Sequence, residues 1–259
     1  MSAVKAQFSL FTILPVNASM EDVDELSRNF WTAPLIGLFY GLIAGSLFWL
    51  LHDVFGGLVS ATIVILVVHM LNRFLHFDGL IDLGDGLVAT GTQEKRLAAM
   101  KDTRVGAGGV SYGVMFTLLI VASLASLPGV AGLLFFVPLA MEVLAKNGLV
   151  SAASLGRERE GLGSPFVKNA GTSAMLMSTA LSFAIVMLLA ILFVAPRSGF
   201  LVAIFLAFCM VLASVVAGVV VSVIATRAFG CVNGDVMGAT NELSKAAVLL
   251  ATLAVLAWL

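Results

Sequence analysis

The chain has 259 residues, of which 60% are hydrophobic and 11% are charged, and its formal net charge is −1. Soluble domains carry about 25% charged residues, so this composition excludes an ordinary soluble domain and indicates an integral membrane protein. The two cysteines, Cys209 and Cys231, form no CxxC pair and give no sign of a disulfide framework or a thiolate metal site.

Apolar runs of nearly membrane-spanning length recur along the chain. A helix needs about 20 apolar residues to cross about 30 Å of hydrocarbon. We therefore expect an all-α integral membrane protein, a polytopic bundle of about seven transmembrane helices with cytoplasmic catalytic loops, in which residues 1–259 form a single domain. The runs lie near residues 33–51, 55–75, 110–127, 129–146, 171–195, 199–224 and 245–259. The last run is short for a complete span, and we expect no removable signal peptide because the N-terminal segment has no convincing cleavage site.

Positive charge is distributed unevenly over the connections between these runs. If the N-terminus lies inside, every one of the 14 lysines and arginines except Arg197 falls on the inner side. Cytoplasmic loops carry the positive excess in membrane proteins. We therefore expect a multi-pass protein of the cell membrane whose N-terminus and long loops, 76–109, 147–169 and 225–244, face the cytoplasm.

Few charges fall within the runs themselves. A carrier places polar groups near the bilayer midplane, and the best candidates here, Glu142 and Lys146, stand four residues apart near the inner end of the fourth run. We interpret them as a local ion pair. The charge pattern therefore disfavours a transporter.

An acidic segment, HFDGLIDLGDG over residues 76–86, follows the second run directly. Asp78, Asp82 and Asp85 stand at positions i, i+4 and i+7, which places all three carboxylates on one face of a helix about two turns long. Like charges at this spacing repel, so an ordered cluster needs a cation, and oxygen ligands of this kind suit Mg²⁺. The alternative is an acidic loop at the membrane edge in which the carboxylates are merely solvated.

The first inner loop continues with a segment of good helix formers. We expect a helix over Gln93–Met100 that lies along the membrane interface, with Leu97 and Met100 towards lipid.

Charges of both signs follow this segment. Asp102 stands beside Lys101 and Arg104, ahead of a glycine-rich stretch. Acids for a metal and bases for phosphate in one loop indicate a site for an anionic metal complex, as in phosphoryl transfer.

The other two inner loops carry further polar residues. The polar residues of the last loop stand among glycines. They are Arg227, Asn233, Asp235 and Glu242. Asp235 either completes the metal site or accepts a proton from a hydroxyl nucleophile, or it caps the helix that follows. The middle loop adds the charges Arg157, Arg159 and Glu160, which either contact phosphate or form a solvated charge run.

Four motifs occur in order on these loops: HFDGLIDLGDG, MKDTRVGAGGV, EGLGSPF and RAFGCVNGDVMGATNEL. From about Phe11 to Leu243 the chain thereby resembles the adenosylcobinamide-GDP ribazoletransferase family, also called cobalamin synthases. The resemblance implies an enzyme that joins adenosylcobinamide-GDP to α-ribazole or its 5′-phosphate, with Mg²⁺. The products would be adenosylcobalamin or its 5′-phosphate and GMP, in the final assembly of the nucleotide loop of cobalamin.

The resemblance also implies roles for particular residues. The expected metal ligands are Asp78, Asp82 and Asp85. The expected catalytic residues are Asp82, Asp102 and Asp235. The expected substrate-binding residues are Lys101, Arg104, Arg157, Glu160, Arg227 and Asn233.

Three other functions are alternatives to this one. A CDP-alcohol phosphotransferase sets aspartates around a metal in a similar way, but its pattern has Ala-Arg after the first Asp-Gly, where this chain has Leu80-Ile81. A cation transporter and a membrane scaffold are the other two. Besides its substrates we expect the lipid bilayer as a partner and no nucleic acid. The GxxxGxxxG row of Gly37, Gly41 and Gly45 allows close helix contact, either inside the bundle or in a homo-oligomer.

Overall fold

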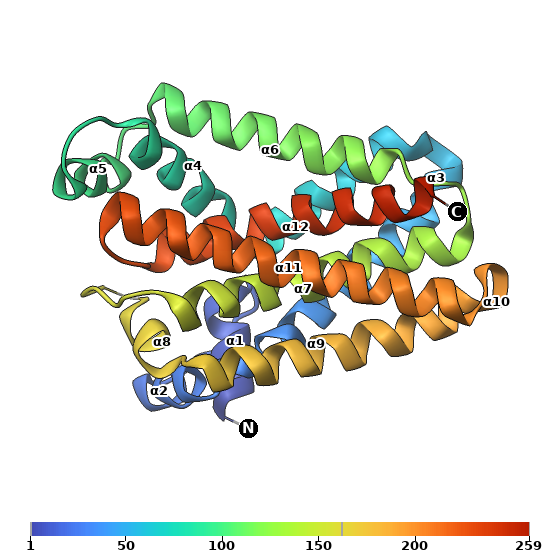
Figure 1. The fold of residues 1–259 in the computed structure, drawn as a ribbon, viewed down its shortest axis with the longest axis horizontal. Helices are drawn as coiled ribbons and strands as arrows, with labels where there is room; N and C mark the ends of the chain where they lie inside the picture. Colours follow the sequence, from blue (N-terminus) through green and yellow to red (C-terminus); the bar gives the residue numbers. More distant parts are fainter. Residues whose placement is uncertain (1, 162, 259) are drawn as a thin grey trace.

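The computed structural model describes residues 2–161 and 163–258, which form helices, turns and loops without any strand. Within this part, six helices are long and apolar enough to cross a membrane. They lie roughly side by side in one elongated bundle (Figure 1). The predicted all-α polytopic fold is confirmed.

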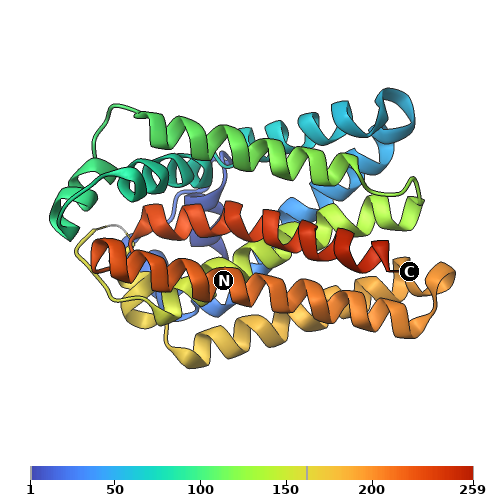
Figure 2. The ribbon, with the colours of Figure 1, turned by 45° about the horizontal axis from the view of Figure 1, so that its top comes forward.

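Helix α3 (Ala33–Leu71) contains two of the predicted spans. Gly56, at φ 75° and ψ 166°, leaves the helical conformation in the middle of its 39 residues. Positive φ is accessible to glycine without steric cost, so the chain reverses there, and Figure 2 shows the two arms meeting at one end of the bundle. The runs 33–51 and 55–75 are therefore the two arms of α3, and the six long helices accommodate the seven predicted apolar runs.

The glycine row of the first arm packs against α7 (Ala131–Leu155) of the same chain. A Cβ added at Gly37 would lie 2.6 Å from the carbonyl oxygen of Glu142, and one at Gly41 would lie 2.6 Å from that of Leu139. The row is thus used inside the bundle, and a homo-oligomer remains a prediction. Helix α7 is the central helix, because 94% of an 18-residue apolar stretch within it is buried.

The acidic segment is helical and continues the second arm of α3 after a break. Arg73 and Phe74, at φ 55° and 57°, separate α3 from α4 (Leu75–Val88). Left-handed backbone is uncommon for residues with side chains. The helix that carries the aspartates is therefore turned out of the line of the span before it.

Helix α5 (Gln93–Met100) has the predicted bounds, but its apolar side chains do not face lipid. Leu97 is 5% exposed and Met100 is fully buried. A Cβ at Gly86 of α4 would lie 2.9 Å from the Cβ of Met100. The lipid-facing interpretation is wrong, because α4 covers this face.

Helix α12 (Gly234–Ala257) begins 11 residues before the predicted run 245–259. Its first three turns contain polar residues that the sequence suggests are a loop, yet most of them, including Thr240, Asn241 and Glu242, are buried in the bundle. With 24 residues, α12 is long enough for a complete span, because the helix extends the short last run towards the N-terminus. Leu259 lies outside the described residues.

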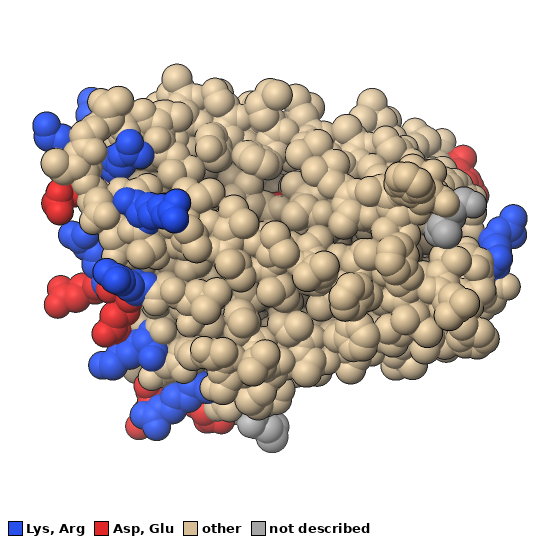
Figure 3. All heavy atoms as spheres, viewed as in Figure 1, with Lys and Arg blue, Asp and Glu red and all other residues tan. Residues whose placement is uncertain are grey.

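The remaining helices complete the two ends of the bundle. They are α1 (Ser2–Phe11), α2 (Met20–Arg28), the 3₁₀ helix η1 (Phe30–Thr32), α6 (Ala107–Ala125), α8 (Ser164–Asn169), α9 (Thr172–Phe193), α10 (Ala195–Ser198) and α11 (Phe200–Phe229). Acidic and basic side chains gather at the end that holds α2, α5 and α8 (Figure 3). We call this the charged end, and α10, with Arg197, lies at the opposite end.

Candidate active site

A cavity of about 250 Å³ opens at the charged end between α1, α4, α8 and α12. Asp78 of α4 and Asp235 of α12 both line it, together with His76. Most of the other lining side chains are apolar or aromatic, among them Phe11, Phe30, Phe166 and Met237. The cavity therefore joins an apolar interior to two carboxylates.

Helices α4 and α12 approach closely beside these carboxylates. A Cβ added at Gly79 would lie 2.5 Å from the carbonyl oxygen of Asp235 and 3.2 Å from the backbone nitrogen of Ala239. Only glycine allows this backbone contact without a shift of one helix. The Asp-Gly pair at 78–79 thus brings the aspartates of the first and last inner segments together.

Asp82 lies on the same helix, one turn beyond Asp78. Burial, followed by repulsion from the carboxylates of Asp78, Asp235 and Asp85, raises the pKa of Asp82 to about 7. Asp82 and the three carboxylates that repel its charge form an anionic region that attracts a cation.

Asp85 makes a contact that sequence reasoning missed. Its two carboxylate oxygens accept hydrogen bonds from the backbone N–H groups of Gly106 and Gly109, both at 2.8 Å. These groups begin α6, where a carboxylate is favoured by free N–H groups and by the helix dipole. Asp85 therefore ties the end of the first inner loop to α4.

The side chains of Asp78, Asp82 and Asp85 do not by themselves converge on one metal position in the described structure. Among the described residues, no group of three or more His, Cys, Asp or Glu side chains is arranged to hold a metal ion. Mg²⁺ is often bound by one or two carboxylates plus substrate phosphates and water. Within residues 2–161 and 163–258, the side chains of Asp78 and Asp82 make no hydrogen bond, so they fit that mode better than Asp85 does.

Asp102 and Arg104 form a pair at the exposed end of the first inner loop. The Arg104 guanidinium donates to both Asp102 oxygens, at 3.0 and 3.2 Å. This contact lowers the pKa of Asp102 to about 2, so the carboxylate is ionised at neutral pH. Lys101, at the C-terminus of α5, is exposed beside it.

Asn233 rather than Asp235 caps α12. Its side-chain oxygen accepts from the backbone N–H of Val236 at 3.0 Å, and its amide donates to Asp235 at 2.9 Å. The alternative interpretation of Asp235 as the helix cap is therefore wrong. The Asn233 amide instead orients the Asp235 carboxylate at the cavity.

The remaining predicted substrate-binding residues lie at the charged end outside the cavity. The carbonyl oxygen of Arg157 accepts from the backbone N–H of Val232 at 2.9 Å, which joins the middle and last inner loops. Arg157 and Glu160 are exposed. Arg227 lines a separate surface hollow with Gln93, away from Asp78 and Asp235.

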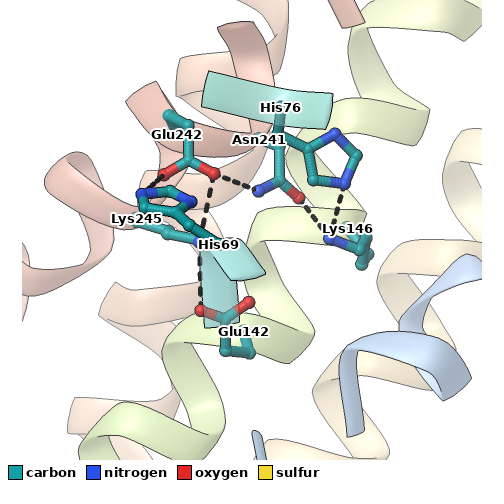
Figure 4. Close-up of polar contacts among 7 residues, drawn as sticks. All are labelled: His69, His76, Glu142, Lys146, Asn241, Glu242 and Lys245. Atoms are coloured by element: carbon teal, nitrogen blue, oxygen red, sulfur yellow. Dashed lines mark hydrogen bonds and ion pairs between the residues drawn. The ribbon is translucent and has the colours of Figure 1, made fainter. Parts of the chain in front are cut away.

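A buried network of charged and polar side chains reaches the cavity wall at His76 (Figure 4). The Lys245 ammonium is 3.1 Å from carboxylate oxygens of both Glu142 and Glu242, and all three side chains are at most 2% exposed. The predicted ion pair between Glu142 and Lys146 is wrong, because Glu142 pairs with Lys245 of another helix. Such a pairing depends on how α7 meets α12, which the spacing within one helix does not reveal.

Lys146 belongs to the second part of this network. Its ammonium lies 2.6 Å from the side-chain oxygen of Asn241 and 3.1 Å from Nε2 of His76. Asn241 in turn donates to Glu242 at 2.9 Å. The network thus leads from His76, in the cavity wall, to the Lys245 ion pairs, and places Lys146 and Lys245 in the interior rather than in inner loops.

Comparison with known proteins decides the family. The sequence model described as cobalamin-5-phosphate synthase matches residues 3–253. The chain belongs to this family. Three relatives are each called adenosylcobinamide-GDP ribazoletransferase. That of Methanococcoides burtonii is 31% identical over 96% of this chain and 90% of its own length, and that of Methanosarcina barkeri is 30% identical with the same coverage. That of Prosthecochloris aestuarii is 30% identical over 95% of both chains. No solved structure matches the chain.

For this cobalamin-5-phosphate synthase family member, the fold separates most of the predicted site residues into two groups. Asp78, Asp82 and Asp235 come together at the cavity and its rim. Lys101, Asp102, Arg104, Arg157 and Glu160 are exposed on the loops of the charged end. Sequence reasoning missed His76, whose signal was its place two residues before Asp78 of the first Asp-Gly pair.

Proposed function

We propose that the protein joins adenosylcobinamide-GDP and α-ribazole, or α-ribazole 5′-phosphate, to give adenosylcobalamin, or its 5′-phosphate, and GMP. The family assignment and the names of the relatives support this activity. The proposed position of the site rests on one observation: Asp78 and Asp235 line the same cavity, and Asp82 is close to both.

The reaction is a phosphoryl-group substitution. A ribose hydroxyl of α-ribazole attacks the phosphorus next to cobinamide, the bond from that phosphorus to the GMP oxygen breaks, and GMP leaves with that bond's electrons. The hydroxyl loses its proton as the new bond forms. Catalysis of this kind depends mainly on positioning and on neutralising charge.

A Mg²⁺ ion suits the carboxylates of Asp78 and Asp82. Repulsion from neighbouring carboxylates contributes to the raised pKa of Asp82, and a divalent cation would relieve it. When bound, the ion would neutralise the diphosphate of the substrate. Asp85 remains a candidate third ligand, at the cost of its hydrogen bonds to the start of α6.

Asp235 is the best placed group to accept the hydroxyl proton. It lines the cavity, and the Asn233 amide holds its carboxylate. Asp102, the other candidate, is paired with Arg104 and exposed, so its first role would be to position that guanidinium for phosphate. Lys101 and Arg157 supply further positive charge at the same end, while Glu160 and Arg227 are placed for contacts outside the cavity.

The charged end faces the cytoplasm of a cell membrane in this proposal. The bundle exposes apolar side chains along α9 and α11, among them Leu188 and Phe205, as expected for surfaces in lipid. Lysine and arginine gather at one end, and the positive-inside rule assigns that end to the cytoplasm.

One assay tests the activity. Purified protein in lipid is incubated with adenosylcobinamide-GDP, α-ribazole phosphate and Mg²⁺, and GMP and the corrinoid product are separated and measured. We expect both products in equal amounts. Absence of both, while a relative of known activity forms them in parallel, would contradict the proposed function.

A further inference from the structure

The cavity at Asp78 and Asp235 has a mainly apolar lining with few polar side chains. Leu10, Phe11, Phe30, Leu75, Leu149, Phe166 and Met237 supply apolar surface. The polar side chains in the lining are His76, Asp78 and Asp235. The cavity thus suits a ligand that is mainly apolar and can pack against aromatic side chains, with a polar attachment that reaches the two carboxylates.

The size and lining of the cavity indicate which part of the two substrates it can hold. At about 250 Å³, it is at or below the small end of the range for drug-sized ligands, about 300–1,000 Å³. A corrin ring is far too large for it. Guanine is small enough, but its edges carry several donors and acceptors that an apolar wall leaves unpaired. The base of α-ribazole, 5,6-dimethylbenzimidazole, is a flat apolar bicycle with one free ring nitrogen, which is a hydrogen-bond acceptor.

His76 offers the matching donor. It is 2% exposed and lines the cavity. Its Nε2 lies 3.1 Å from the Lys146 ammonium. An ammonium group can only donate, so Nε2 must be the acceptor and the ring proton must be on Nδ1. Within residues 2–161 and 163–258, Nδ1 has no hydrogen-bond partner, and Figure 4 shows it on the side of the ring away from Lys146.

The buried network fixes this state of the imidazole. Two carboxylates, Glu142 and Glu242, balance two ammonium groups, Lys146 and Lys245, so the network is neutral while the histidine is neutral. Asn241 connects the two halves, with its oxygen towards Lys146 and its amide towards Glu242. These contacts hold the Lys146 ammonium against Nε2 of His76.

We propose, resting on the function proposed above, that this cavity binds the benzimidazole base of α-ribazole and that Nδ1–H of His76 selects it by donating to the free ring nitrogen. The attached ribose then extends towards Asp78 and Asp235, where its hydroxyl reacts. His76 is a specificity-determining residue in this arrangement, and Lys146 is a positioning residue that acts through it.

The test compares two ribotides that differ in one ring atom. One is α-ribazole 5′-phosphate, and the other is its 5,6-dimethylindole analogue, in which carbon replaces the free ring nitrogen. The kcat/KM of each is measured from GMP release with saturating adenosylcobinamide-GDP. We expect the unaltered protein to prefer the benzimidazole ribotide by about tenfold or more, because the analogue leaves a buried donor unpaired.

Three variants assign this preference to His76. His76→Phe should bring the ratio of the two kcat/KM values close to one. His76→Asn, whose amide places an N–H near the position of Nδ1, should restore much of the preference. His69→Phe alters a second buried histidine near Glu242, outside the cavity lining, and should leave the ratio unchanged.

The outcomes separate this inference from the function on which it rests. If the unaltered protein forms no product from α-ribazole phosphate, the proposed function fails. If it forms product but uses both ribotides equally well, or if His76→Phe retains the full preference, the inference is overturned. If a variant turns over too slowly for kinetics, the Kd values of the two ribotides, measured by equilibrium dialysis, give the ratio instead. The comparison in the unaltered protein does not depend on whether any variant folds.

Discussion

The chemistry of the site is concentrated on a few carboxylates that differ in their surroundings. Asp82 is partly buried among other acids, Asp85 is held by two backbone N–H groups, and Asp102 is paired with an arginine. All three residues are aspartates, but their surroundings favour different roles. Asp82 suits a cation site, Asp85 ties α4 to α6, and Asp102 orients the Arg104 guanidinium.

Replacement of Asp82 should separate activity from folding. We expect Asp82→Ala to reduce turnover at least about 1,000-fold, because the substrate diphosphate loses a carboxylate that holds its cation, while thermal stability in detergent is retained. Asp53→Ala is the matched control, since the Asp53 side chain is 93% exposed at the opposite end of the bundle. GMP release measures the activity, and an Asp82→Ala protein with normal activity would remove Asp82 from the mechanism.

The raised pKa of Asp82 also predicts how stability depends on pH without divalent cations. The folded protein keeps this proton up to about pH 7, whereas the unfolded chain releases it near the ordinary value of 3.8. The folded state therefore binds more protons between these values, and stability falls as pH rises through this window. Asp82→Asn removes the ionisable group and with it this dependence on pH. In EDTA, the melting temperature of the variant minus that of the unaltered protein should therefore be larger at pH 8 than at pH 5. A gain that shrinks as pH rises would contradict the assignment.

At the scale of helices, the site depends on how α4 is held. It leaves the line of α3 at Arg73 and Phe74, contacts α12 through Gly79 and contacts the start of α6 through Asp85. These contacts come from three segments far apart in the sequence. The position of the aspartates is therefore a property of the packing of α4 and not of α4 alone.

The Asp85 anchor should be important for stability as well as activity. Asp85→Ala removes both hydrogen bonds to Gly106 and Gly109 and should lower the free energy of unfolding by about 2 kcal/mol. Thermal unfolding in detergent measures this loss, and Asp82→Ala is the comparison that should not show it. Equal stability of the two variants would show that the loop does not depend on Asp85.

The contact between α7 and α12 gives a second prediction at this scale. Lys245→Met leaves the carboxylates of Glu142 and Glu242 buried without their shared cation, and should cost about 3–5 kcal/mol of stability. Lys5→Met removes a lysine from an ion pair in which its side chain is 49% exposed, and should cost less than about 1 kcal/mol. Chemical denaturation in detergent compares the two, and similar losses would argue against a tightly paired interior network.

For the whole molecule, the uneven distribution of charge is the basis of the proposed orientation in the membrane. Nearly all lysines and arginines that reach the surface lie at the charged end, whereas Arg197 lies in the turn between α9 and α11 at the other end. In the proposed orientation, the site would open towards the cytoplasm, the compartment that contains nucleotides.

Cysteine labelling tests this orientation. In a protein with Cys209 and Cys231 replaced by alanine, Ser198→Cys should react with a membrane-impermeant maleimide in intact cells. Glu94→Cys, on exposed α5, should react only after the membrane is permeabilised. The reverse pattern would place the charged end outside and refute the proposed location of the site.

The sequence by itself determined the features that depend on local composition and periodicity. Apolar runs of spanning length require helices because backbone groups in lipid must pair within their own segment. The spacing of Asp78, Asp82 and Asp85 placed them on one helix face, and the helix formers of Gln93–Met100 predicted α5. The order of the loop motifs indicated the family.

Only the tertiary structure decided which distant residues meet. The polar start of α12 resembles a loop in sequence, because nothing local shows that α4 and α7 will bury Asn241 and Glu242. The partner of Glu142 is Lys245 rather than the nearer Lys146, because the free energy of a buried charge depends on contacts across helices. For the same reason, the meeting of Asp235 with Asp78, and the place of His76 beside them, follow from the close packing of α4 against α12 at Gly79.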